Sequence, residues 1–177
     1  MSQFMELCQR RQSSRGFSDM PVEHEKLEQI VGAARLAPSG CNAQPWSFIV
    51  VESPEAVAQV AEAGRQMGLN AFLQTAKAFV IILEEHATLV PVIRKILDSQ
   101  YFAKGDIGAA AVSVCYAATE LGLGTCNIGI YDREKIANAV GIPIEKQFGA
   151  LIAVGYPADE TIRPKVRKEI SEVLRFV

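Results

Sequence analysis

Two continuously apolar segments place the strongest limits on how this 177-residue chain can fold. Residues 78–83 read AFVIIL and residues 149–154 read GALIAV, so neither contains a polar side chain. A strand with one face in water alternates polar and apolar residues, whereas a strand covered on both faces is apolar throughout. The two segments are therefore predicted to be central strands of a sheet that is flanked by helices.

The other elements are predicted from cap residues, prolines and apolar spacing. Ser53 and Pro54 are typical of the cap and the first turn of a helix, and Asp132 is typical of a second cap. The predicted elements are a helix at about 4–10, a helix that begins after Pro21 and stops at Pro38, a strand at 47–51, a helix from Pro54 to about Met67, and a helix from Arg133 that ends at Gly141.

Residues 106–121 are predicted to form a helix with an unusual surface. The segment is apolar on nearly every side, and small residues recur along it. A helix of this kind is buried by neighbours on all of its faces. A single domain of this length rarely encloses a helix so completely, although a core helix in a monomer is one interpretation.

Residues 37–46 (APSGCNAQPW) combine turn-forming residues, small side chains and amides in one short loop. Pro38 and Pro45 restrict the backbone, and Gly40 lets the main chain approach a flat ring without a side chain between them. The loop is therefore a candidate ligand-covering segment. The alternative is that it only ends the preceding helix and begins the next strand.

Two basic clusters lie near the ends of the chain, at residues 10–17 (RRQSSRGF) and 163–168 (RPKVRK). Arginine presents a planar fork of donors that matches phosphate oxygens. Lys165 and Arg167 can point to the same side of an extended segment. A phosphate site is one interpretation of these clusters, and a pair of solvated charge runs is the other.

Charge and hydropathy argue against several classes of protein. Eighteen basic and twenty acidic residues leave a net charge of −2, which favours neither nucleic acid nor a membrane surface as a partner. No apolar run reaches the roughly 18 residues of a membrane span, and Glu6, Arg10 and Arg11 stand where a signal peptide would be apolar. We therefore expect one cytoplasmic domain that spans residues 1–177.

The four cysteines include no Cys-x-x-Cys pair, and the chain has only two histidines. This composition argues against a metal site. The cysteines are predicted to be reduced thiols. Cys41 lies inside the candidate ligand-covering loop, where oxidants or substrate could reach it.

These segments together resemble the nitroreductase family of flavin-dependent oxidoreductases, and the resemblance runs over nearly the whole chain. Residues 11–17 are similar to the family's N-terminal Arg-Arg-Ser-x-Arg-x-Phe signature, with Gln12 at the second arginine. Residues 38–46 resemble its flavin-contacting loop, residues 121–129 resemble the segment along the flavin ring, and residues 165–167 match its C-terminal Lys-x-Arg pair. Each pattern is weak alone, but four in the family's order and spacing are strong.

The resemblance implies an α+β, nitroreductase-like fold in which helices flank a central mixed β-sheet. It also implies an intertwined homodimer, with the helix at 106–121 as the central interface and the C-terminal tail reaching over the partner. The segment at about 84–104 is the expected lid over the pocket. Within it, Tyr101 and Phe102 could stack on an aromatic acceptor, although packing of the lid onto the core is the interpretation that we favour.

The resemblance further implies FMN bound at the subunit interface. Asn70 is similar to a family asparagine near the ribityl and pyrimidine region, and an ordinary turn asparagine is the alternative. The predicted FMN contacts are Arg11, Ser13, Arg15, Lys165 and Arg167 at the phosphate, Gln12 at the pyrimidine edge, Pro38, Ser39, Gly40 and Asn42 from the partner subunit, Asn70, and the main chain of Ile128 and Gly129 beside the hydride-accepting nitrogen.

The implied activity is that of an FMN-dependent oxidoreductase in which the flavin carries the hydride chemistry, so no catalytic side chain is required. NADH or NADPH would reduce the flavin and leave before a nitroaromatic, quinone or similar electron-poor acceptor enters, in a ping-pong mechanism. Many relatives carry Glu where this chain has Gly129, which leaves the choice between NADH and NADPH open. The alternatives are a same-fold flavin enzyme with specialised chemistry such as reductive dehalogenation, and a flavin-binding or redox-sensing protein without turnover.

Overall fold

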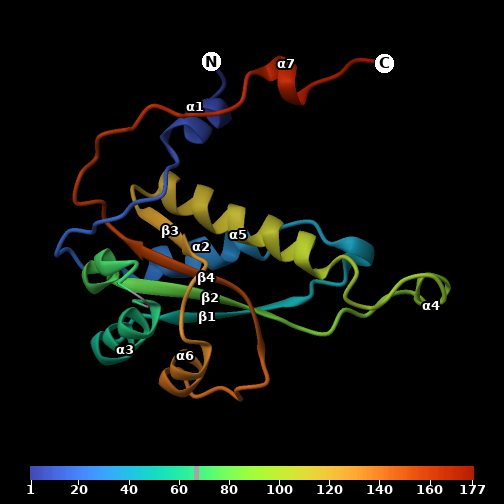
Figure 1. Cartoon of the computed structure of the whole chain (residues 1–177), viewed down its shortest axis with the longest axis horizontal. Helices are drawn as coiled ribbons and strands as arrows, with labels where there is room; N and C mark the ends of the chain where they lie inside the picture. Colours follow the sequence, from blue (N-terminus) through green and yellow to red (C-terminus); the bar gives the residue numbers. More distant parts are fainter. Residues whose placement is uncertain (66–67) are drawn as a thin grey trace.

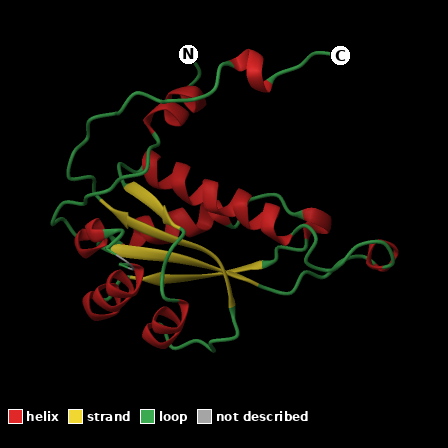
Figure 2. Cartoon of the chain, viewed as in Figure 1, coloured by secondary structure: helices red, strands yellow, loops and turns green. Residues whose placement is uncertain are grey.

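One four-stranded β-sheet forms the middle of the computed structural model, which describes residues 1–65 and 68–177 (Figure 1, Figure 2). The two continuously apolar segments are its central strands, as predicted, because β2 (Ala78–Glu84) pairs with β4 (Gln147–Gly155). β1 (Trp46–Val51) lies at one edge beside β2, and β3 (Gly124–Ile128) lies at the other edge beside β4.

All three pairs of neighbouring strands are antiparallel, so the expectation of a mixed sheet is wrong for the strands of one chain. The connections explain the difference. Val51 at the end of β1 pairs with Phe79 near the start of β2, so the chain re-enters the sheet at the end where it left. A parallel pair would need a crossover to the opposite end. Among the described residues, the only parallel pairing is the isolated bridge between Ser13 and Thr125.

Helices cover both faces of the sheet (Figure 1). α2 (His24–Ala34) and α5 (Ala103–Glu120) pack on one face. α3 (Pro54–Gly64) and α6 (Arg133–Ala139) pack on the other. The sheet is therefore buried on both sides, in agreement with the apolar sequences of its central strands.

The strand β2 shows why a continuous apolar sequence is needed there. Phe79 and Ile81 belong to the core beneath α3 and α6, while Val80 and Ile82 belong to the core beneath α2 and α5. All four side chains are fully buried. Since successive residues of a strand point to opposite faces, a polar residue at any of these positions would be buried as well.

The predicted helix caps are confirmed. The side chain of Ser53 accepts a hydrogen bond of 3.4 Å from a main-chain amide in the first turn of α3. Asp132 accepts one of 3.1 Å at the start of α6. The helix α3 ends at Gly64, and its predicted end at Met67 lies outside the described residues.

The helix α5 confirms the predicted long helix but is buried on one side only. Ile107, Ala110 and Val114 are buried against the sheet, whereas Gly108 and Val112 are exposed. A single chain therefore leaves a stripe of small and apolar residues uncovered. Among the described residues, no helix combines the length and the apolar character that a bilayer crossing requires.

The two ends of the chain run together away from the sheet (Figure 1). The predicted N-terminal helix is present as α1 (Gln3–Arg10), which packs on α5. Beyond Pro157 the chain is extended except for the short helix α7 (Ile170–Val173). Large apolar side chains of this tail are exposed, and Phe176 retains 87% of its accessible surface.

Between β2 and α5 the chain makes a long excursion that carries the short helix α4 (Pro91–Arg94) and projects beyond the sheet (Figure 1). This excursion is the segment predicted as a lid. Gln100 fixes its base, because its side chain donates to the Glu84 carboxylate at 2.7 Å and accepts from the Ala87 amide at 2.8 Å. Ile96 is exposed, so the outer part of the excursion is not packed into the core.

Candidate functional site

The N-terminal basic cluster is held against β3 in an extended conformation. Ser13 forms the parallel bridge with Thr125, and the Ser14 amide donates to the Thr125 carbonyl at 2.9 Å. Alternate residues of an extended segment face opposite sides. The residues on one side are Arg11, Ser13 and Arg15, and those on the other are Gln12 and Ser14.

The C-terminal basic cluster lies directly beside this segment. The Lys165 ammonium group donates to the Arg11 carbonyl, and the Arg163 guanidinium group donates to the Ser13 carbonyl. Arg163 and Ser13 are 150 positions apart in the sequence. The two basic clusters therefore form one surface rather than two unrelated charge runs.

This surface carries an excess of positive charge, although the Asp159 carboxylate interacts electrostatically with Arg163. Partial burial and the neighbouring cations, Arg11 first among them, lower the pKa of Lys165. In the part of the chain that the structure describes, no carboxylate forms an ion pair with these basic groups. Guanidinium and ammonium groups that form no ion pair suit an anion with several oxygens, such as a phosphate. The residues that we call the cation cluster are Arg11, Arg15, Arg163, Lys165 and Arg167.

Two buried cysteines lie behind the cation cluster. Burial raises the pKa of both thiols, Cys115 and Cys126. The positive charges of Arg11, near the first thiol, and Arg15, near the second, oppose this shift only in part. Both thiols therefore stay protonated and are poor nucleophiles.

The end of β3 offers an open approach for a flat ligand. Ile128 is buried, whereas Gly129 is exposed, and a β-carbon added at Gly129 would meet no atom within 4 Å. A cavity of about 400 Å³ lies here between α5 and β4, and both predicted residues line it. Gly108 and Gly149 also line the cavity, so little side-chain bulk surrounds it.

Asn70 lies near the same end of β3, but its side-chain amide is already used. The residue has a left-handed backbone conformation with a φ of 56°. Its Nδ2 donates to the Gly64 carbonyl at 3.1 Å and to the Ile130 carbonyl at 3.3 Å. These contacts favour the interpretation as a turn asparagine, and a cofactor contact stays a prediction.

The predicted ligand-covering loop has an unusual backbone that α5 holds in place. Cys41 and Asn42 have left-handed φ values of 55° and 52°. The Gly40 amide donates to the Asp106 carboxylate, at 3.2 and 3.1 Å from its two oxygens. A β-carbon at Gly40 would come within 2.7 Å of the Phe102 ring. Non-glycine residues in this conformation store strain, which is common at ligand sites.

The loop and the cation cluster lie at opposite ends of α5. Asp106 is in the first turn of the helix, whereas Arg10, next to Arg11, donates to the Thr119 carbonyl near its last turn at 3.0 Å. At about 1.5 Å per residue, about 20 Å separate these two helix positions. One chain therefore does not bring the loop to its own cation cluster.

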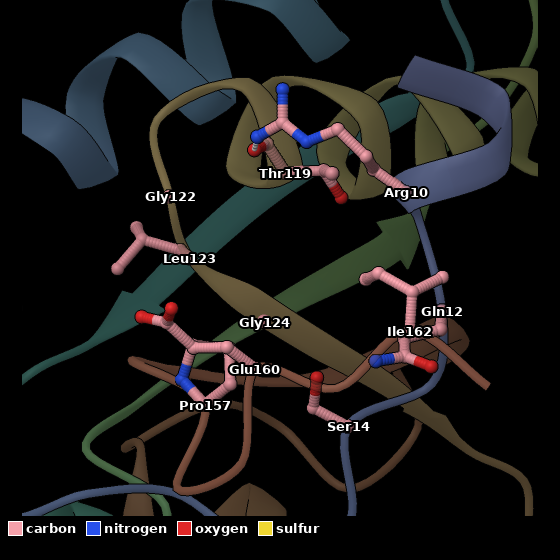
Figure 3. A pocket seen from close by; sticks show the side chains of 10 residues that line it. All are labelled: Arg10, Gln12, Ser14, Thr119, Gly122, Leu123, Gly124, Pro157, Glu160 and Ile162. Carbon is pink, nitrogen blue, oxygen red and sulfur yellow. Dashed lines mark hydrogen bonds between the residues drawn. The ribbon is translucent and has the colours of Figure 1, made fainter. Parts of the chain in front are cut away.

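Gln12 faces away from the predicted phosphate residues. Its side chain donates to the Thr161 carbonyl at 2.9 Å and accepts two hydrogen bonds from Arg163 at 3.2 Å. Figure 3 shows Gln12 beside Ile162, at the rim of a cavity of about 400 Å³ that Ser14 also lines. The structure thus places the side chain of Gln12 against the C-terminal tail.

The two lid aromatics have different surroundings. Tyr101 is 64% exposed, and its ring meets the Phe102 ring edge to face with centroids 5.1 Å apart. Phe102 is partly buried beside Gly40. Phe102 therefore packs against the loop at Gly40 and Tyr101 is exposed, and packing of the lid onto the core stays a prediction.

Sequence patterns did not assign a role to Arg163 or to Asp106. Arg163 stands in a basic run, and only the fold shows that it contacts the N-terminal segment. Asp106 belongs to no motif, because its partner is the main-chain amide of Gly40, 66 positions earlier. A contact to main chain leaves no signal in the identity of the partner side chain.

Comparison with known families agrees with this geometry. The family model described as Nitroreductase family matches residues 8–156. The chain belongs to the nitroreductase family. The resemblance inferred from the four sequence motifs is thereby confirmed.

Individual relatives of this nitroreductase-family chain cover most of its length. A protein of Archaeoglobus fulgidus designated an NADH dehydrogenase/NAD(P)H nitroreductase is 32% identical over 164 residues, which are 90% of this chain and 88% of the relative. Iodotyrosine deiodinase of Haliscomenobacter hydrossis is 24% identical over 189 residues, covering 95% and 85% of the two chains.

A solved structure confirms the predicted fold. A protein of Exiguobacterium sibiricum, described as a nitroreductase in complex with FMN, superposes with a TM-score of 0.84. The match covers 100% of this chain and 98% of the other, at 23% sequence identity. The nitroreductase fold therefore extends over the whole chain.

Proposed function

We propose that this protein is an FMN-dependent oxidoreductase that uses NADH or NADPH to reduce nitroaromatics, quinones or similar electron-poor acceptors. The observation that carries the proposal is the cation cluster, in which both ends of the chain bring an excess of positive charge to the edge of β3. The name of the A. fulgidus relative and the FMN complex of the structural neighbour support the same assignment.

The residues present fit the parts of FMN. Arg11 and Arg15 flank Ser13 on one side of the extended segment, so two guanidinium forks and a hydroxyl can share one phosphate. The space beside Gly129 suits the flat ring. Such a cluster would distinguish FMN from riboflavin, which carries no phosphate.

A second copy of the chain completes the site in this proposal. The ligand-covering loop is held about 20 Å from the cation cluster of its own chain. The stripe on α5 that includes Gly108 and Val112 is uncovered, as are large apolar residues of the tail such as Val166 and Phe176. A two-fold pairing through α5 would cover the stripe and bring each loop to the other chain's cation cluster.

In this arrangement the protein binds and orients the cofactor. Bound FMN supplies the hydride chemistry of a ping-pong reaction. The cation cluster holds the phosphate. Main-chain N–H groups at Ile128 and Gly129 are expected to donate to the ring where negative charge develops. The absence of a side chain at Gly129 leaves room for either substrate. The predicted cytoplasmic location would supply NADH and NADPH.

The deiodinase relatives favour reductive dehalogenation as a second candidate function. Iodotyrosine deiodinase of H. hydrossis matches nearly the whole chain, although at lower identity than the A. fulgidus relative. The two functions would differ at the lid, the segment at about 84–104. The exposed ring of Tyr101 would be accessible there to an aromatic acceptor of either kind.

Absorption spectroscopy and steady-state kinetics of the purified protein test the proposal. We expect a flavin absorption band, and oxidation of NADH or NADPH that depends on a nitroaromatic or a quinone. A requirement for a halogenated phenol would select the second function, and flavin binding without oxidation would identify a binding or sensing protein. Colourless protein that takes up no added FMN would refute both enzymatic assignments.

A further inference from the structure

The side chain of Gln12 binds the C-terminal tail through both atoms of its amide. Nε2 donates to the Thr161 carbonyl at 2.9 Å. Oε1 accepts from the main-chain amide and from the side-chain Nε of Arg163, each at 3.2 Å. A primary amide donates and accepts at once, which neither a guanidinium group nor a carboxylate can do. Glutamine is therefore suited to tie one extended segment to another.

The tail has few other attachments where it passes the cation cluster. Residues 161–167 form neither helix nor strand, and most of them are exposed. Their other bonds to the N-terminal segment come from the cations themselves, from Lys165 to the Arg11 carbonyl and from Arg163 to the Ser13 carbonyl. Like charges gathered this closely repel one another, so these bonds alone hold the tail poorly.

Gln12 and the predicted phosphate residues lie on opposite sides of the N-terminal segment. The alternation of an extended backbone separates Gln12 from Arg11 and Ser13. Figure 3 shows its side chain near Ile162, which belongs to the tail, and Gln12 lines the same cavity as Ser14. An effect of Gln12 on FMN must therefore pass through the tail.

We propose that Gln12 is a positioning residue for the cofactor phosphate. Its amide holds Thr161 and Arg163, and it thereby fixes the path of the tail that presents Lys165 and Arg167 to the phosphate. The inference rests on the proposed function, because it states how the FMN site is assembled. It replaces the expected contact between Gln12 and the pyrimidine edge of the flavin.

Gln12→Met tests this role, because methionine keeps the length of the side chain and removes both donor and acceptor. The full-length chain is titrated with FMN and with riboflavin. We expect the Kd for FMN to rise about tenfold, which is the effect of losing one or two net hydrogen bonds, and the Kd for riboflavin to stay unchanged. Gln59→Met, at an exposed position on α3, is the matched control and should change neither value.

Two further measurements separate positioning from general damage. In the Lys165→Met background, Gln12→Met should have a smaller effect on FMN affinity, because one of the cations that it positions is gone. Amide hydrogen exchange of the FMN-bound protein should accelerate in residues 161–167 of Gln12→Met and stay unchanged in β2 and β4, which would show that the variant is folded.

Equal losses of FMN and riboflavin affinity would indicate a direct contact with the flavin ring and would overturn the positioning role. An unchanged Kd for FMN in Gln12→Met would overturn it as well. Failure of the wild-type protein to bind FMN is a different result, since it would refute the proposed function and the positioning role together.

Discussion

Replacing Lys165 with methionine is the most direct test of the cation cluster. Methionine keeps most of the side-chain stem and removes the charge. A charge-assisted hydrogen bond to the FMN phosphate would contribute about 1.5–3 kcal/mol. The Kd for FMN, measured by titration of the full-length chain, should therefore rise about 10- to 150-fold.

The same substitution should lower the stability of the cofactor-free protein only slightly. Lys165 loses its bond to the Arg11 carbonyl, but its repulsion from Arg11 and Arg167 is removed as well. Thermal unfolding should therefore show that Lys165→Met lowers the melting temperature more with FMN present than without it. Lys168→Met, which removes an exposed charge three positions along, is the matched control and should leave the Kd within about twofold.

Lys165 also gives FMN affinity a pH dependence of definite sign. Partial burial and the neighbouring cations lower the pKa of Lys165 in the cofactor-free protein, so its charge is lost at a lower pH than in the unfolded chain. Its contribution to cofactor-free stability accordingly rises with pH across that interval, because the unfolded state holds the proton more tightly. FMN affinity should instead fall over the same interval, since the phosphate requires the charged form. This fall should be absent from Lys165→Met, and equal FMN affinities of the two proteins at neutral pH would refute the phosphate role.

Three other variants test different parts of the site and fold. Arg15→Ala and Arg167→Ala should each weaken FMN binding by about 1–3 kcal/mol, and titration that finds wild-type affinity would remove that residue from the phosphate site. Gly40→Val should displace the loop, because its first added carbon would overlap the Phe102 ring, and a normal flavin spectrum with normal turnover would contradict the placement of the loop. Ile81→Ala should lower the free energy of unfolding by about 2–5 kcal/mol while leaving the flavin spectrum of the folded protein intact, as urea denaturation can show.

The central strands and the capped helices were predictable because their causes are local. A strand buried on both faces must be apolar at every position, and β2 and β4 meet this condition over nearly their whole length. A serine followed by proline, or an aspartate before a helical segment, satisfies amides only a few positions away. Such signals can be recognised in a short stretch of sequence.

β3 gave no comparable signal. Its sequence GTCNI includes the exposed Asn127 and the buried Thr125, since it pairs with β4 on one side and with the irregular N-terminal segment on the other. The antiparallel order of the sheet depends on where each connection returns, which no single strand encodes. The contacts of the site are equally hard to predict from sequence, because the partners of Gln12 belong to a segment about 150 positions away.

The ligand-covering loop and the cation cluster lie at opposite ends of α5, and this spacing leads to a test that needs no structure of the dimer. Gly40→Val damages the loop, and Lys165→Met damages the cation cluster. If each site combines the loop of one chain with the cluster of the other, a hybrid of the two variants has one site with both defects and one site with neither. Random pairing makes half of the dimers hybrids, so the mixture should recover about a quarter of the wild-type activity from two impaired variants. Sites built within single chains would show no recovery, because every site would then carry one of the two defects.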